Sequence, residues 1–338
     1  MNLWYVAVPL LFIAGVALFS SPCPGQTALS KAQLDEARAF FAATPATAQN
    51  RAARQERMKI IQAAADGLTP EQYVAYLEAC VKDPQRADAL ERDGILYYLA
   101  RSVEGVFTDV QRTRVKSGVA VWHLYNIGYI FKTPETCFGV DINVRNAARF
   151  APLLDFLLST HEHPDHNSPD LIEAMVKANK PVLTRNYPGT TQVTAPGEYR
   201  FGTVRVKVDI GDHHFDWPNN SDNMLMYQIE CGPATNDYVI YHSGDGNNYQ
   251  KMKPDKPVDL FIMHVGVGMN VEEAIRLLQP KFSLGSHVLE LAHSPKPPQA
   301  WRLTFNYAFG VVQNIPAEQA DVLTWGERWL APGATMGS

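Results

Sequence analysis

The sequence predicts a mixed α/β protein in which a helical N-terminal part precedes a larger domain of strands and helices. Residues 29–116 show helix caps and apolar stripes of helical period, and β-rich segments broken by turn residues begin at Gly118. Further along the chain, strand and helix patterns alternate, which is typical of βαβ steps with parallel strands. With 338 residues, 46% of them hydrophobic, the chain can form one large domain with an appendage or two modest domains.

The segment 1–26 is predicted to be a signal peptide or a membrane anchor. Its 17 residues from Leu3 to Phe19 are nearly all apolar, which is the length of a signal h-region or of a short membrane span. Helix-breaking residues follow directly at 20–25, so a buried core helix is the weaker interpretation. We expect an exported protein, periplasmic or secreted, whose N-terminal segment is either cleaved or kept as a membrane tether.

Residues 27–116 are predicted to form a helical extension. Helices are expected over residues 31–43, 47–65 and 84–103, with a further helix beginning at Pro70. No group of side chains suited to catalysis occurs here, so the extension is expected to be a packing cap or an oligomer surface. A cluster of basic residues in the second helix is expected to form a solvated face; its members are Arg51, Arg54, Arg57 and Lys59.

The densest chemical signal is at residues 160–166, which read Thr-His-Glu-His-Pro-Asp-His and follow a mostly apolar run. The apolar run predicts a buried strand, and the polar run predicts a turn at its end. His161 and His163 are two residues apart, so in an extended or tightly turned backbone they point the same way. Asp165 and His166 follow the proline that bends the chain. Each pair can hold one ion, and imidazole and carboxylate ligands suit zinc, manganese or iron.

This H-x-H-x-D-H pattern resembles the signature of the metallo-β-lactamase superfamily. The order of segments over residues 258–287 (strand, helix, Pro-Lys, strand, His) resembles the branch that contains ascorbate-phosphate lactonase-like hydrolases. The resemblance implies a four-layer αββα sandwich over residues 117–332, with metal ions at the edge of the sheets. The helical extension is a departure from the superfamily pattern, and it leaves the substrate open because added elements shape the pocket.

The resemblance also implies further metal ligands downstream. The first ion needs a third ligand, which is expected at the strand end carrying His213 and His214. Adjacent residues at a strand end point opposite ways, so one of these two is expected to bind, with His213 favoured and His214 lining the pocket. Asp245, on a sharp turn, is expected to bridge the two ions, and His287 to complete the second set. Asp141 is expected to support a ligating histidine through a hydrogen bond.

The function implied by the resemblance is metal-dependent hydrolysis. Two divalent ions, zinc in the first place with manganese or iron as alternatives, are expected to supply a hydroxide that cleaves an ester, lactone, amide or phosphoester bond in a small molecule. Asp165 is expected to orient the nucleophile or to carry a proton to the leaving group. Candidates for holding the substrate are Tyr125, Asn126, His214 and His264.

Three alternative functions stay open at this point. The chain could be a phosphodiesterase acting on a lipid or nucleotide, an iron-dependent oxidoreductase, or a non-catalytic metal-binding protein of the same fold. A seven-ligand complement argues against the last, because structural metal sites are closed sets of four ligands. A formal charge of −5 without a basic run argues against nucleic acid as a partner.

Overall fold

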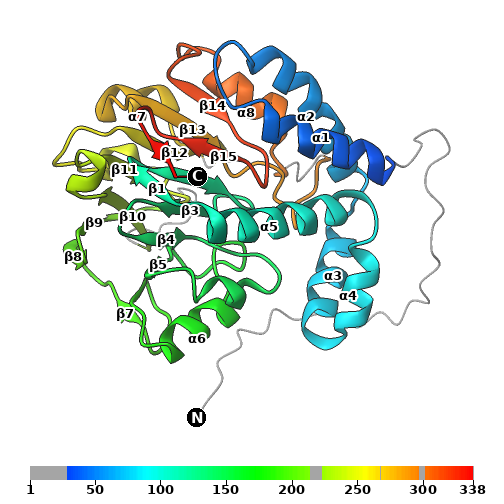
Figure 1. The fold of residues 1–338 in the computed structure, drawn as a ribbon, viewed down its shortest axis with the longest axis horizontal. Coiled ribbons are helices and arrows are strands. Elements are labelled where there is room, and N and C mark those ends of the chain that lie inside the picture. The colour runs from blue at the N-terminus through cyan, green and yellow to red at the C-terminus, as the bar shows by residue number, and fades with distance from the viewer. Residues whose placement is uncertain (1–28, 214–222, 267, 297–300, 338) are drawn as a thin grey trace.

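The fold was obtained as a computed structural model, which describes residues 29–213, 223–266, 268–296 and 301–337 (Figure 1). The predicted signal peptide or anchor at residues 1–26 lies outside the described residues. Within the described ranges, no helix is both long and apolar enough to cross a membrane.

Two seven-stranded mixed sheets form the centre of the molecule. The first sheet has the order β15-β2-β3-β4-β5-β6-β7 and the second has the order β14-β13-β12-β11-β10-β9-β8. The strands of the first sheet are β2 (Ala120–His123), β3 (Tyr129–Lys132), β4 (Cys137–Val140), β5 (Phe156–Leu158), β6 (Val182–Thr184), β7 (Thr191–Gln192) and β15 (Arg328–Leu330). Those of the second sheet are β8 (Gly197–Phe201), β9 (Val204–Gly211), β10 (Met224–Glu230), β11 (Val239–His242), β12 (Leu260–His264), β13 (Phe282–Ser286) and β14 (Ala320–Val322). A separate antiparallel pair joins β1 (Val115–Ser117) to β16 (Thr335–Met336).

Alternating side chains of each central strand enter two different cores. In β12, Leu260 and Ile262 pack in the core between the two sheets, whereas Phe261 and Met263 pack in the core on the helix side. Because both faces are covered, such strands are buried at every position and read as continuous apolar runs.

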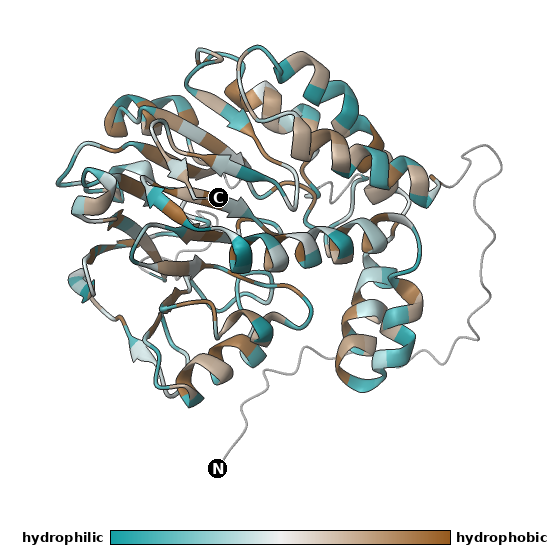
Figure 2. Cartoon of the chain, viewed as in Figure 1, coloured by the Kyte–Doolittle hydropathy of each residue, from teal (hydrophilic) through white to brown (hydrophobic). Residues whose placement is uncertain are grey.

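Helices cover the outer faces of both sheets. They are α1 (Lys31–Ala43), α2 (Arg51–Asp66), α3 (Pro70–Lys82), α4 (Pro84–Leu90), α5 (Gly94–Arg112), α6 (Pro169–Lys177), α7 (Val271–Leu278) and α8 (Phe305–Val312), with short 3-10 turns at Ala147–Phe150, Pro233–Thr235 and Tyr249–Lys251. Helix α6 packs on β5 and β6, and α8 packs on β13 and β14. Hydrophilic and hydrophobic residues alternate along the helices (Figure 2), as expected of elements buried on one side. The predicted αββα sandwich is thereby confirmed.

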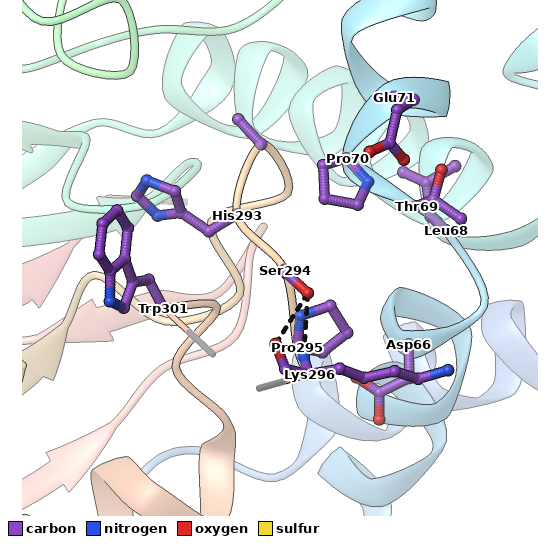
Figure 3. A pocket seen from close by; sticks show the side chains of 11 residues that line it. Asp66, Leu68, Thr69, Pro70, Glu71, His293, Ser294, Pro295, Lys296 and Trp301 are labelled. Atoms are coloured by element: carbon purple, nitrogen blue, oxygen red, sulfur yellow. Dashed lines mark hydrogen bonds between the residues drawn. The ribbon is translucent and has the colours of Figure 1, made fainter. Parts of the chain in front are cut away.

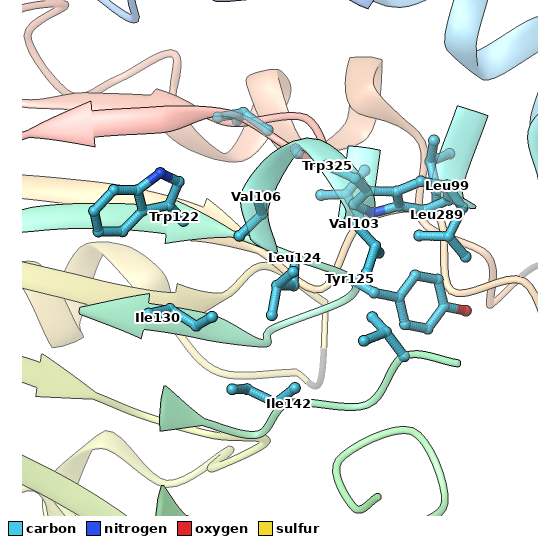
Figure 4. Close-up of a cluster of buried hydrophobic side chains, with 14 of the residues drawn as sticks. Leu99, Val103, Val106, Trp122, Leu124, Tyr125, Ile130, Ile142, Leu289 and Trp325 are labelled. Carbon is cyan, nitrogen blue, oxygen red and sulfur yellow. The ribbon is translucent and has the colours of Figure 1, made fainter. Parts of the chain in front are cut away.

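The helical extension shares a hydrophobic core with the sandwich. Val103 and Val106 of α5 lie against Leu124 and Ile130 of the first sheet (Figure 4). Helices α1 and α2 pack on α5, and α2 also packs on α8. The extension is therefore built into the same core as the strands of the first sheet.

The prediction of a solvated basic face on α2 is wrong for Arg54. This side chain is fully buried, and its guanidinium donates two hydrogen bonds to the carboxylate of Glu327, at 2.5 and 2.9 Å. It also donates to the carbonyl oxygens of Thr44 and Val322. Arg54 lies on the side of α2 that faces the turn before β15, where the buried Glu327 requires a cation.

Most predicted helices occur where expected, with one break that the prediction missed. Helix α1 covers the predicted residues 31–43 and begins with a capping box between Ser30 and Gln33. The single helix predicted over residues 84–103 is instead two helices, α4 and α5. Gly94 has a φ of +60° at the junction, a left-handed conformation that interrupts a continuous helix and that glycine adopts readily.

Candidate metal centre

Strand ends from both sheets bring the candidate ligands to one place. Strands β5, β9, β11 and β13 each end one to three residues before a candidate ligand, namely His161, His213, Asp245 and His287. His161 lies in the loop that follows β5 of the first sheet. The other three ligands follow strands of the second sheet. Residues that are more than a hundred positions apart in the sequence therefore meet at the edge of the two sheets.

The structure groups these side chains into two sets that could each hold a metal ion. The first set is His161, His163, His213 and Asp245, and the second set is Asp165, His166, Asp245 and His287. Within each set, one ligand atom per residue lies within 4.8 Å of all the others. Asp245 belongs to both sets, which is the position of a carboxylate that bridges two ions.

The hydrogen bonds of two histidines leave their second nitrogen for a cation. The Nδ1 of His161 lies 3.0 Å from the hydroxyl of Thr160, and the Nδ1 of His166 lies 2.9 Å from the carboxylate of Asp141. With the proton on Nδ1 in each ring, Nε2 is the free electron pair. Among the described residues, neither Nε2 nor Oδ1 of Asp245 makes a well-aligned hydrogen bond, although all three atoms are buried and Nε2 of His166 lies 3.2 Å from carboxylate oxygens of Asp165 and Asp245. Buried polar atoms without partners are costly, and a cation at each set would remove that cost, so the donors fit divalent metal ions.

Asp141 occupies the supporting position that the sequence suggested. Its carboxylate accepts hydrogen bonds from the backbone N–H of Thr160 at 2.7 Å, from the Thr160 hydroxyl at 2.8 Å and from His166. These three bonds hold the rings of His161 and His166 through one carboxylate and one hydroxyl. Thr160, which the sequence analysis did not single out, therefore helps to fix a ligand of each set.

The charges of the centre favour the metal-binding forms of Asp245 and His161 but the protonated form of His166. Burial alone would raise the pKa of the Asp245 carboxyl, but the imidazoles of His166 and His287 hold this pKa well below its usual range. Burial and the charge of His166 lower the pKa of His161 well below its usual value. Burial opposes protonation of His166 as well, yet the carboxylates of Asp245 and Asp165 raise its pKa well above the usual value. The raised pKa favours the protonated form of His166, so we expect metal binding through Nε2 to release a proton.

Several left-handed backbone conformations occur at the same place, although others occur elsewhere in the described residues. Asn126, Asp141 and His287 all have positive φ values, of 58°, 48° and 65°, a conformation that is uncommon for residues other than glycine. Gly244, directly before Asp245, has a φ of +50°, and a Cβ there would lie 2.6 Å from Met224 and 2.8 Å from the methyl group of Thr160. Such strain persists where the surroundings fix it, and it clusters at functional sites.

The four candidates for holding a substrate have different positions. Asn126 lies at the second set, because its amide nitrogen is 2.8 Å from Oδ2 of Asp165 and 2.9 Å from Nε2 of His287. His264 also faces this set, with Nε2 3.7 Å from Oδ1 of Asp245. Tyr125 does not: its ring is buried in the hydrophobic core (Figure 4) and its hydroxyl accepts the backbone N–H of Leu291 at 2.7 Å. The fourth candidate, His214, lies outside the described residues, so the choice between it and its neighbour stays a prediction.

Two buried histidines, His123 and His242, hold the turn that carries Asn126. His123 makes a 3.0 Å hydrogen bond through Nε2 to the carbonyl oxygen of Asn126, and His242 makes a 3.1 Å bond to that of Ile127. The same Asn126 oxygen accepts the backbone N–H of His287. The bond from His242 has no local sequence signal, because His242 lies on the second sheet and is 115 residues from Ile127.

A cavity of about 460 Å³ lies between the helical extension and the segment that follows His287 (Figure 3). One wall is the turn from α2 into α3, and the opposite wall carries His293 and Trp301. None of its lining residues belongs to either metal set. The extension thus forms one wall of a cavity whose other wall is the segment after His287, the last ligand in the chain.

Comparison with known proteins agrees with this architecture. Residues 143–284 match the family model described as the beta-lactamase superfamily domain. No curated protein matches the chain. Among solved structures, the chain is similar to a possible metal-dependent hydrolase from Veillonella parvula, with 13% identity over 63% of this chain and 99% of that one and a TM-score of 0.50.

Two further structures show lower similarity. One is Igni18, a metallo hydrolase from Ignicoccus hospitalis, with 14% identity over 62% of this chain and 97% of that one and a TM-score of 0.46. The other is the metallo-beta-lactamase fold protein YhfI from Bacillus subtilis, with 12% identity, 63% and 99% coverage and a TM-score of 0.44.

The two sheets, their outer helices and the paired metal sets thus define a metallo-β-lactamase fold. The family match lies inside this fold, so residues 143–284 are similar to the beta-lactamase superfamily domain. The resemblance to the ascorbate-phosphate lactonase-like branch stays a prediction.

Proposed function

We propose that this protein is a hydrolase that uses two divalent metal ions to cleave an ester, lactone, amide or phosphoester bond in a small molecule. The observation that carries the proposal is the pair of ligand sets joined by Asp245. When bound, two such ions provide a hydroxide near neutral pH and polarise the group under attack. Zinc suits the first set, in which three of the four ligands are imidazoles, and manganese or iron is compatible with the more carboxylate-rich second set.

The residues around the second set give Asp165 a defined orientation. Its Oδ2 accepts a hydrogen bond from Asn126 at 2.8 Å and lies 3.2 Å from Nε2 of both His166 and His287. Burial alone would raise the pKa of the Asp165 carboxyl, but His166 holds this pKa well below its usual range. Asp165 is therefore ionised and can accept a hydrogen bond from the nucleophile, and the amide of Asn126 keeps it turned towards the ions.

Metal-dependent turnover of model substrates tests the proposal. Protein reconstituted with zinc or manganese is assayed with an aryl ester, a lactone, an anilide and a phosphodiester, and the class that is hydrolysed ranks the bond types. Asp165→Ala should abolish the activity, because it removes one ligand and the acceptor beside the nucleophile. Glu162→Gln, in the same loop and exposed, is the matched control because this carboxylate belongs to neither set. Hydrolysis that persists in a metal-free protein, or that Glu162→Gln and Asp165→Ala reduce equally, would contradict the proposal.

A further inference from the structure

His264 lies beside the second metal set without belonging to it. It ends β12, its ring is 3% exposed, and it stacks on the ring of His287 with centroids 4.0 Å apart and planes at 25°. Its backbone N–H donates to the hydroxyl of Ser243 at 3.2 Å. The ring is thus held against one ligand and above Asp245, with little freedom to turn.

The hydrogen bonds of this ring determine where its proton lies. Nδ1 of His264 accepts the backbone N–H of Gly266 at 2.9 Å, so Nδ1 carries a lone pair and not a proton. The single proton of the neutral ring is then on Nε2, the nitrogen that faces Asp245. The tautomer is opposite to that of His161 and His166, whose protons lie on Nδ1.

This tautomer makes His264 a poor ligand in the observed geometry. Coordination through Nε2 would move the proton to Nδ1, where it would face the N–H of Gly266 at 2.9 Å, donor against donor. The distance from Nε2 to Oδ1 of Asp245, 3.7 Å, is also too long for a direct hydrogen bond. Among the described residues, Nε2–H of His264 is therefore left with an electrostatic contact to the Asp245 carboxylate and no direct hydrogen bond to it.

The neighbouring strand provides an internal comparison. β11 ends in His242-Ser243-Gly244 and β12 ends in His264-Val265-Gly266, and in each the histidine Nδ1 accepts the N–H of the glycine two residues on. In the first case Nε2–H is used by the protein, since it donates to the carbonyl oxygen of Ile127 at 3.1 Å. In the second case the same device leaves the donor pointing at the metal sets.

We propose that the Nε2–H of His264 is a preset hydrogen-bond donor to an oxygen of the bound substrate, either the attacked oxygen or that of the leaving group. The scissile group must then present an oxygen acceptor beside the second set, as the carbonyl of an ester, lactone or amide or the oxygens of a phosphoester do. The role of His264 towards a substrate rests on the proposed hydrolase function. The assignment of Nε2–H as a donor rests only on the hydrogen bonds of the ring.

The sharpest variant is His264→Asn. The asparagine side-chain oxygen can take the place of Nδ1 and keep the bond to Gly266, whereas nothing replaces the donor at Nε2. The zinc-loaded variant should retain about two equivalents of metal. It should lose ~100–1,000-fold in kcat/KM, the effect of removing one donor to a developing oxyanion. It should also bind inorganic phosphate about tenfold more weakly, as expected for one lost hydrogen bond.

Two readouts separate this role from a structural one. The thermal midpoint of His264→Asn should stay near that of the wild type, whereas His242→Asn should lower it, because only the latter donor has a protein acceptor. In ¹⁵N spectra of the histidine-labelled protein, the zinc-loaded wild type should contain a neutral imidazole protonated at Nε2 that His264→Asn lacks.

The outcomes distinguish the donor from the hydrolase proposal. Loss of one metal equivalent in His264→Asn would make His264 a ligand and overturn the inference. Unchanged phosphate affinity and unchanged turnover would overturn it as well, while leaving the hydrolase intact. If the wild type hydrolyses none of the model substrates but His264→Asn still weakens phosphate binding, the hydrolase proposal fails and the donor stands.

Discussion

Replacing Asp141 by asparagine should weaken the binding of the second metal ion more than that of the first, because Asp141 contacts His166 directly but reaches His161 only through Thr160. Asparagine has the same shape as aspartate and tolerates the left-handed φ of 48° at this position, so the substitution should leave the backbone conformation unchanged. The change replaces one carboxylate oxygen by an NH₂ group. If this group faces Nδ1 of His166, that nitrogen must accept instead of donating, and the proton of the ring moves to Nε2, the atom that faces the ions.

The size of the effect follows from the contacts that are lost. Removing the carboxylate partner of a metal-binding histidine lowers metal affinity by ~10–100-fold, which corresponds to ~1.4–2.7 kcal/mol. Zinc affinity is measured for each equivalent by competition with a chromophoric chelator. Asp155→Asn is the control, because this exposed carboxylate accepts a backbone hydrogen bond from Cys137 at 2.7 Å and is in neither metal set. Equal weakening of both zinc ions, or an equal effect of Asp155→Asn, would refute the assignment of Asp141 to His166.

Three further predictions concern the framework of the site. Arg54→Met should lower the free energy of unfolding in urea by ~3–5 kcal/mol, because it leaves the carboxylate of Glu327 buried without its cation, whereas Arg57→Met, which breaks an exposed pair on the same helix, should cost ~1 kcal/mol or less. Gly244→Ala should reduce both zinc content and stability, since its Cβ would collide with Thr160, and Gly202→Ala is the matched control with a φ of +59° and open space around it. Binding of the second zinc at pH 7 should release a proton, because burial of His166 is outweighed by its carboxylates and its pKa is raised well above the usual value. The zinc affinity should therefore rise with pH until the pKa of His166 is passed. Calorimetry in two buffers of different ionisation enthalpy measures the number of protons released on zinc binding. A heat of binding that is the same in both buffers would contradict this prediction.

Local spacing in the sequence predicts those parts of the candidate site that lie close together in the chain. His161, His163, Asp165 and His166 are close in the chain, so their convergence needs only one turn after a strand. His287 directly follows a recognisable strand, and the resemblance to the superfamily implies it as a ligand of the second set. Residue spacing and position relative to a strand can be seen in the sequence without knowledge of how the elements pack.

Other parts depend on contacts between distant segments and could not be predicted. The amide of Asn126 meets Asp165, 39 residues away, only because the β2–β3 turn faces the metal loop. Tyr125, its neighbour, was predicted to line the site but enters the core, since adjacent residues of a turn can face opposite ways. Arginine is usually exposed, so the sequence indicates a surface position for Arg54. Its burial is explained only by the position of Glu327 in the turn before β15.

The most direct test of the two-metal centre is the zinc content of reconstituted wild type, Asp165→Ala and His213→Ala by elemental analysis. The wild type should hold about two equivalents, as a binuclear site requires. Each variant should hold about one, because each removes a ligand of a different set and leaves the other set complete. No bound metal in the wild type after reconstitution, or two equivalents retained in both variants, would contradict the account.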